Sequence, residues 1–325
     1  MLTFLGKLNI AVLLLLISAS QTWGVIPPHT VVDGSVRLAG VSPDNPIIYD
    51  NDWWKDVPDA VYLWAKVSLG QADLKGNIVT RDMWEWEKGY LYKPGEGMKD
   101  ARALLKMARD SGLQHIPDPI VGANEALVRP ESGKIEETKF SRTPGSDLIV
   151  AEAKKATPDK PLLVFVGGTC TTVATAYLTD PTIADRLIVF QIDGGAYNGT
   201  DGWAWKIAEQ KLLFANWARG YFWGDWSQWN PELFKELPNN PLCDMLRDYS
   251  TSDLGKANQW GDGAWIFALY EPRCITKVES YNETAITVPK EGTDAKRMEA
   301  EFFATLKQAA LFEKSPAKPA SGGTK

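Results

Sequence analysis

The sequence predicts an α/β protein with a Rossmann-like open sheet, mostly parallel and flanked by helices. The prediction rests on three apolar runs, residues 47–49, 161–166 and 187–192, that are typical of buried strands. Each run leads into a turn, and helical spacing of apolar residues follows the first two. With 325 residues and 44% hydrophobic content, the chain is long enough for one large α/β domain.

The first of these segments is rich in carboxylates. Asp50 and Asp52 end the apolar run, and Asp56 and Asp59 follow in the turn and at the start of a helical pattern. The acids therefore lie at the carboxyl end of a strand and at a helix start. In open α/β sheets this edge is where ligands bind.

Four clustered carboxylates need a counter-charge if all are ionised. A hard cation with oxygen ligands supplies it, so the segment predicts a metal site, for Ca²⁺ first and Mg²⁺ second. The simpler alternative is a helix N-terminus, where aspartate is favoured in any case. That alternative accounts for Asp56 or Asp59, but Asp50 and Asp52 precede the turn.

Later segments add candidate groups. Residues 167–172 form a Gly-rich turn from a strand to a helix, where a carbonyl could bind a metal or an amide an anion. A plain βα turn is the alternative. Asp193 ends the strand at 187–192, and Asp262 precedes a helix expected over residues 264–270. A simple helix cap is the alternative for Asp262.

Composition limits the chemistry. A formal net charge of -6 and a pI of about 5.2 argue against a nucleic-acid partner. His29 and His115 are the only histidines, so few are available to act as a base or as metal ligands. Six of the 14 tryptophans fall between residues 203 and 229, more than core filling usually takes. Aromatic faces of this kind could stack on a nucleobase or a sugar ring.

The ends of the chain differ from its centre. Residues 1–24 resemble a signal peptide, because Lys7 precedes an apolar run too short to span a bilayer. They predict a secreted or periplasmic protein that is free of the membrane after cleavage, with a retained anchor as the alternative. Residues 25–46 are expected to form an irregular lead-in, residues 47–312 the domain, and residues 313–325 a disordered tail.

None of the three cysteines belongs to a Cys-x-x-Cys pair, which makes zinc improbable. Cys170 is expected to be buried beside a strand. In an oxidising compartment, Cys243 and Cys274 could form a disulfide.

Several segments resemble, in order, the motifs of the inosine/uridine-preferring nucleoside hydrolase family. The resemblance spans about residues 47–290, as in a divergent, secreted member. The matching segments are Asp50-Asn51-Asp52 with Asp59-Ala60-Val61, Gly168-Thr169-Cys170-Thr171-Thr172 with Asp180-Pro181-Thr182-Ile183, Asp193-Gly194-Gly195, and Gly261-Asp262-Gly263.

The resemblance implies a nucleoside-hydrolase-like fold and hydrolysis of an N-ribosyl bond. It implies that Ca²⁺ is held by Asp52, Asp59, the main-chain carbonyl of Thr171, and Asp262. Asp52 would take a proton from a metal-activated water. The candidate substrate-binding residues are Asp50, Asp56, Asp82, Asp193, Trp53, Trp205 and Lys206.

The chain also departs from the family pattern. The ribose-binding Glu-x-Asn of the family corresponds to Ala204-Trp205-Lys206, and Gly261 replaces the family's histidine. Two alternatives therefore stay open. One is a non-catalytic protein that uses the metal to bind a sugar or nucleoside, and the other is a hydrolase of another glycoside. The expected partner is a small molecule, and the sequence is also compatible with a homo-oligomer.

Overall fold

The computed structural model describes residues 29–32, 35–53, 57–81, 93, 95–192, 201–217, 230–252, 263–280, 285–288 and 292–311. The predicted signal peptide and tail lie outside these ranges and stay predictions. Within the described ranges, no helix combines the length and the apolar character needed to cross a bilayer.

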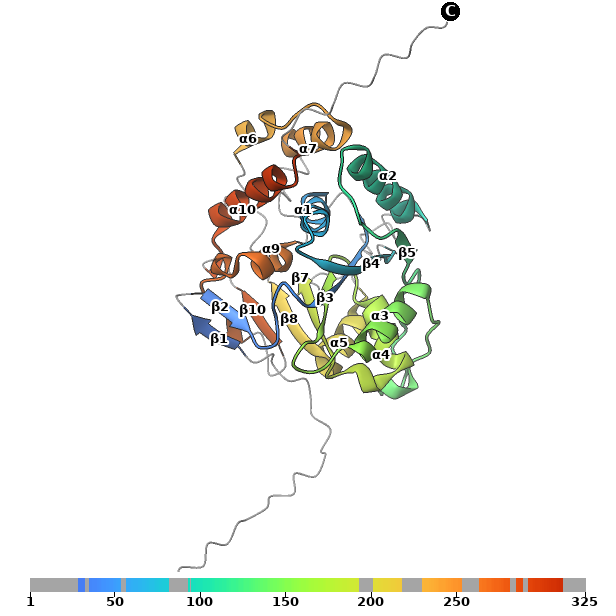
Figure 1. Cartoon of the computed structure of the whole chain (residues 1–325). Coiled ribbons are helices and arrows are strands. Elements are labelled where there is room, and N and C mark those ends of the chain that lie inside the picture. Colours follow the sequence, from blue (N-terminus) through green and yellow to red (C-terminus); the bar gives the residue numbers. More distant parts are fainter. Residues whose placement is uncertain are drawn as a thin grey trace, which may run out of the picture.

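Eight of the described strands form one sheet in the order β5-β4-β3-β6-β7-β8-β10-β9 (Figure 1). Neighbours pair in parallel, and β9 is antiparallel to β10. This confirms the predicted open, mostly parallel sheet. The strands are β3 (Pro46–Asn51), β4 (Asp73–Val79), β5 (Pro119–Val121), β6 (Leu162–Val166), β7 (Leu187–Ile192), β8 (Leu213–Trp217), β9 (Glu279–Ser280) and β10 (Ala285–Val288).

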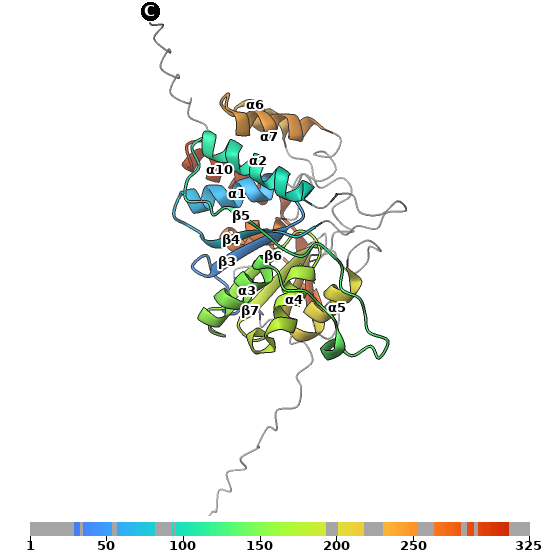
Figure 2. The same cartoon turned by 90° about the vertical axis from the view of Figure 1, so that its right-hand side faces the viewer.

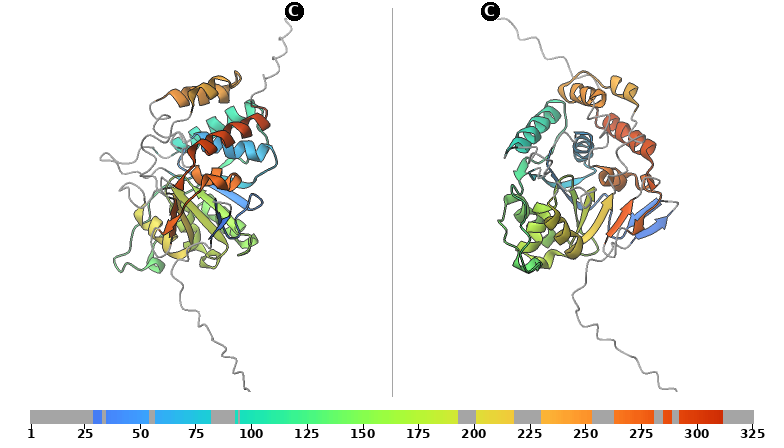
Figure 3. Two further views of the ribbon diagram at one scale, coloured as in Figure 1. Left: turned by 90° about the vertical axis from the view of Figure 1, so that its left-hand side faces the viewer. Right: turned by 180° about the vertical axis from the view of Figure 1, so that it is seen from behind.

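Helices cover both faces of the sheet (Figures 1 and 2). Helices α3 (Pro144–Lys155), α4 (Thr171–Thr179) and α5 (Gly202–Lys211) cover one face. The other helices lie over the opposite face, as the side and rear views also show (Figure 3). They are α1 (Val57–Ser68), α2 (Glu96–Asp110), α6 (Pro231–Lys235), α7 (Pro241–Thr251), α9 (Ala264–Tyr270) and α10 (Ala295–Gln308).

The central strands are buried on both sides, which explains why they have continuous apolar runs. Alternate residues point to opposite faces. Tyr49 and Phe165 belong to the core under α1 and α9, whereas Ile48 and Val164 belong to the core under α3 and α4. The sheet is thus fixed from both sides, and its strand ends form a rigid base for a site.

Two regions differ from the sequence prediction. The lead-in contains an antiparallel pair, β1 (His29–Val32) and β2 (Ser35–Leu38), where no regular structure was expected. The Asp33-Gly34 dipeptide between the two apolar runs is a typical hairpin signal. Strand β8 lies in the Trp-rich region, for which no strand was predicted. Its run of apolar residues is interrupted by Asn216 and begins just after α5 ends, and it pairs with β7 and β10.

The disulfide considered from the sequence does not form, because Cys243 and Cys274 are both free thiols. Cys243 lies on α7 and directs its thiol to the carbonyl of Leu311, whereas Cys274 ends the 3₁₀ turn η4 (Pro272–Cys274). Both are buried, as is Cys170 beside β6, where burial was expected.

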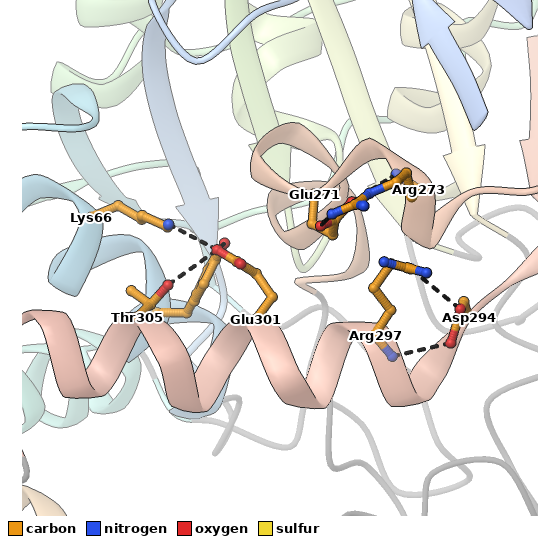
Figure 4. Close-up of polar contacts among 8 residues, drawn as sticks. Lys66, Glu271, Arg273, Asp294, Arg297, Glu301 and Thr305 are labelled. Carbon is orange, nitrogen blue, oxygen red and sulfur yellow. Dashed lines mark hydrogen bonds and ion pairs between the residues drawn. The ribbon is translucent and has the colours of Figure 1, made fainter. Parts of the chain in front are cut away.

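A charged cluster joins α10 to α1 (Figure 4). The Lys66 ammonium lies 2.8 Å from a Glu301 oxygen, and both the Tyr62 and Thr305 hydroxyls donate to that carboxylate. The Lys66 side chain is only 7% exposed and that of Glu301 21%. Arg273 with Glu271 and Arg297 with Asp294 form pairs close by.

We expect Lys66→Met to destabilise the protein, because it leaves a half-buried carboxylate without its cation. The expected loss is about 2 kcal/mol, less than for a fully buried pair, since Glu301 retains some solvent. Urea unfolding of the variant measures it. Lys106→Met breaks the exposed Lys106–Asp110 pair and should cost under about 0.5 kcal/mol. Equal losses in the two variants would contradict the role of burial.

Candidate functional site

The site lies where the strand order changes direction. From β3 the chain builds β4 and β5 on one side of the sheet, and then β6, β7 and β8 on the other. Such a switch point opens a crevice at the carboxyl ends of the two central strands. Here those ends are closely joined: the Gly167 amide donates to the Asp50 carbonyl at 2.8 Å, and the Thr80 amide donates to the Asn51 carbonyl at 3.1 Å.

Asp50 is completely buried at this edge. The Thr80 hydroxyl donates to its Oδ1, and the Thr172 hydroxyl lies beside that of Thr80. Within the described part of the chain, Asp50 Oδ2 is buried with no hydrogen-bond partner. Burial raises the pKa of Asp50 to about 7, and the hydrogen bond from Thr80 opposes that shift. A positive group close by would therefore stabilise the ionised form of Asp50.

Asp52 follows β3 and is 4% exposed. Two glycines pack directly on it. A Cβ on Gly168 would lie 3.0 Å from the Asp52 Cβ, and a Cβ on Gly97 would lie 2.7 Å from the Asp52 carbonyl oxygen. The Gly-rich turn after β6 therefore has glycine at 168 because the backbone passes against the Asp52 side chain.

Asp59 is buried in the first turn of α1. Its Oδ2 accepts a hydrogen bond of 2.6 Å from the Tyr49 hydroxyl, which in turn accepts one from the side-chain Nδ2 of Asn51. A Cβ on Gly263 would lie only 2.2 Å from the Asp59 Cβ. Gly263, the residue after Asp262 in the sequence, therefore lies against Asp59.

Thr171 begins α4, beside the turn that packs on Asp52. Its hydroxyl lies 2.9 Å from the Asp201 carboxylate and 2.9 Å from the Thr169 hydroxyl. The Asp201 carboxylate also accepts hydrogen bonds from the Leu127 and Ala204 amides. Burial raises the pKa of Asp201, while these amides and the Thr171 hydroxyl hold it down.

Sequence reasoning missed two residues that support this edge. Asp201 caps α5 and ties it to α4, and an aspartate just before a helical segment was the available signal. Gln191, near the end of β7, donates to the Gly168 carbonyl at 2.8 Å and accepts from the Cys170 thiol. A glutamine inside an apolar strand was its signal.

The aromatic candidates lie in the core. Trp53 is 4% exposed, stacks on Trp64 with ring centroids 5.6 Å apart, and donates from its indole to the Ile78 carbonyl. Its φ of 64° is rare for a bulky residue. Trp205 is 6% exposed and packs edge-on against Phe214. Contact of either ring with a substrate stays a prediction.

Lys206 is half-buried on α5, with its ammonium 5.9 Å from the ring centroid of Trp203. Four other candidates, Asp56, Asp82, Asp193 and Asp262, lie outside the described residues. Within the described ranges, no three His, Cys, Asp or Glu side chains are grouped as a metal site. The implied calcium set has only two carboxylates there, Asp52 and Asp59.

Asp50, Asp52, Asp59 and Thr171 thus lie at one edge of the sheet, although they come from separate elements. No family model and no curated protein matches the chain. Several solved structures do match the chain. A plant nucleoside hydrolase, PpNRh1, is 14% identical with a TM-score of 0.51, over 81% of this chain and 98% of that one.

The chain has the nucleoside hydrolase fold. A purine-preferring ribonucleoside hydrolase from Gardnerella vaginalis is 16% identical, covering 82% of this chain and 99% of that one at a TM-score of 0.51. The type III effector protein XopQ, complexed with adenosine diphosphate ribose, is 12% identical over 82% and 94% at a TM-score of 0.51. At these identities the likeness establishes the fold, and the chemistry has to be argued from the site.

Proposed function

We propose that this protein is a calcium-dependent hydrolase that cleaves the N-glycosidic bond of a nucleoside or a related ribosyl compound. One observation carries the proposal. Two stretches far apart in the sequence pack on two buried carboxylates that lie at or near the carboxyl end of β3. Gly168 lies against Asp52, Gly263 lies against Asp59, and both carboxylates come from the β3–α1 segment.

The chemistry of this edge fits a hard cation. Its side-chain donors are carboxylate and hydroxyl oxygens, which are the ligands that calcium prefers. Asp50 adds a buried oxygen without a hydrogen-bond partner in the described part of the chain. We propose that Asp52, Asp59, the main-chain carbonyl of Thr171 and Asp262 hold the ion. When bound, calcium would lower the pKa of a water and bind the vicinal hydroxyls of a ribose.

Each residue of the site then has a proposed role. Asp52 would take the proton of the attacking water. Because calcium would lower the pKa of that water, a carboxylate could act as the base in a protein that has only two histidines. Tyr49 fixes the Asp59 carboxylate, and Thr80 fixes that of Asp50. Asp201 and Gln191 hold the turn and the start of α4 in place. Such preorganisation limits the movement of each carboxylate.

A non-catalytic nucleoside- or sugar-binding protein is the second candidate. It is favoured by the absence of the family's Glu-x-Asn at residues 204–206 and by effector proteins among the structures of similar fold. Export directed by residues 1–24 is part of the same proposal, because a secreted protein would meet free nucleosides outside the cell.

A nucleoside panel separates the two candidates. We expect incubation with purine and pyrimidine ribonucleosides and calcium to release free base and reducing sugar in equal amounts. Chromatography of the base and a reducing-sugar assay measure both products. Binding of a nucleoside by calorimetry without release of base would favour the binding protein. Neither binding nor release across the panel would contradict both.

A further inference from the structure

Two buried threonine hydroxyls join the start of α4 to the end of β4. Thr172 is the second residue of α4, and Thr80 directly follows β4. Their hydroxyl oxygens lie within hydrogen-bond distance, although 92 positions separate the two residues in the sequence. Both residues are almost completely buried. The pair therefore ties two distant elements together directly, at the carboxyl edge of the sheet.

The pair belongs to a longer chain of hydrogen bonds whose direction is set at both ends. At one end, the Thr80 hydroxyl donates its proton to Asp50 Oδ1. At the other end, the Ala123 amide donates to the Thr172 hydroxyl at 2.9 Å. Because a hydroxyl has a single proton to give, Thr172 has to be the donor to Thr80. The chain of hydrogen bonds therefore runs in one direction, from Ala123 through both threonines to Asp50.

Two glycines pack closely around the threonine pair. A Cβ on Gly122 would lie 2.6 Å from the hydroxyl oxygens of both Thr80 and Thr172. A Cβ on Gly145 would lie 3.1 Å from the Gly122 Cα. The backbone at residue 122 therefore passes directly against the two hydroxyls, with the backbone at residue 145 behind it. Close packing of this kind leaves the two hydroxyls little freedom to move.

The threonine pair connects the two sides of the proposed cation site. Asp50, which accepts from Thr80, lies two residues before Asp52. Thr172 follows Thr171, whose main-chain carbonyl is another proposed ligand. The Thr171 hydroxyl also lies 2.9 Å from the carboxylate of Asp201, which ties the same turn of α4 to α5. The separation between Asp52 and the Thr171 carbonyl therefore depends on the threonine pair.

We propose that Thr80 and Thr172 are positioning residues that make the site select Ca²⁺ over Mg²⁺. Calcium takes oxygen ligands at about 2.3 to 2.6 Å, whereas magnesium requires about 2.0 to 2.1 Å in near-ideal octahedral geometry. Oxygen atoms on a frame that cannot contract fit the larger ion but cannot close around the smaller one. The inference rests on the proposed function, because it uses the same ligands, and it specifies which ion they hold.

Calorimetric titration of the full chain with calcium chloride and with magnesium chloride tests this inference without a substrate. We expect the wild type to bind calcium more tightly. Thr172→Val removes the hydroxyl and should lower the ratio of the magnesium Kd to the calcium Kd by about 5-fold, roughly the value of one buried hydrogen bond. Thr172→Ser retains the hydroxyl and should restore most of the ratio. Thr175→Val makes the same change at a buried threonine one turn further along α4 and should keep the wild-type ratio.

Thermal melts in excess chelator verify that each variant folds without the ion. If Thr172→Val is unfolded, Thr172→Ala takes its place, because it removes the same hydroxyl without adding a methyl group beside Gly122.

The outcomes separate this inference from the hydrolase proposal. If the ratio is unchanged in Thr172→Val while nucleosides are still hydrolysed, the threonine pair only stabilises the fold, and the proposed function stands. If the ratio falls and Thr172→Ser restores it, but no nucleoside is hydrolysed, the pair has the proposed role and the hydrolase proposal fails. If neither ion binds the wild type, both the selection of calcium and the calcium dependence of the reaction are wrong.

Discussion

Asp52→Asn is expected to lower kcat by a factor of about 10² to 10⁴, because the amide cannot take the proton of the attacking water. The change is nearly isosteric, and Asp52 is held between Gly97 and Gly168, so the fold should persist. Steady-state rates with the best nucleoside of the panel measure the effect. A thermal melt of the variant verifies that it is folded.

Asp73→Asn is the matched control. Asp73 lies at the opposite end of β4, its side chain is 52% exposed, and it pairs only with Lys75 among the ion pairs described. The same chemical change there should leave kcat within about two-fold, as surface substitutions rarely exceed about 0.5 kcal/mol. A fully active Asp52→Asn would show that another group accepts the proton.

Removal of calcium is expected to lower the melting temperature as well as the activity. Asp50, Asp52 and Asp59 are buried at or after the carboxyl end of β3, and burial penalises an ionised carboxylate unless a cation lies beside it. At a calcium concentration 100 times Kd, binding stabilises the folded state by about 2.7 kcal/mol. For a domain of this size, that is a shift in Tm of roughly 4 to 5 °C.

Differential scanning calorimetry with calcium and with excess chelator measures this shift. Asp59→Asn should reduce it strongly, since it removes one proposed ligand while keeping the side-chain volume. Asp118→Asn changes a carboxylate that is 80% exposed and should retain the full shift. If Tm and activity were the same in chelator and in calcium, the proposed role of calcium at this site would be wrong.

The architecture of the sheet could be predicted because its central strands are buried on both faces. Burial demands runs such as those of β6 and β7, which are apolar throughout or nearly so and stand out in a sequence. Strand β8 could not be found in this way, because Asn216 interrupts its short apolar run, which begins just after α5 ends at Lys211. The hairpin of β1 and β2 did carry a local signal, the dipeptide Asp33-Gly34 between the two segments.

At the site, the sequence led to the carboxylates but not to the side chains that hold them. Asp50, Asp52 and Asp59 are close in the chain, so their clustering is visible without a structure. The roles of Tyr49, Asp201 and Gln191 depend on contacts between elements far apart in the sequence, such as the hydrogen bond from Gln191 to the Gly168 carbonyl. The aromatic platform suggested by composition stays a prediction: Trp203 and Trp205 pack into a core, and Trp223, Trp226 and Trp229 lie outside the described residues.

The central claim is that distant oxygen atoms surround one cation beside Asp52. A crystal structure of the protein grown with calcium, with anomalous data to identify the ion, tests it most directly. The account predicts one calcium with oxygen atoms of Asp52 and Asp59 at about 2.3 to 2.6 Å. Carboxylates of Asp52 and Asp59 that point apart, with no ion between them at saturating calcium, would contradict it.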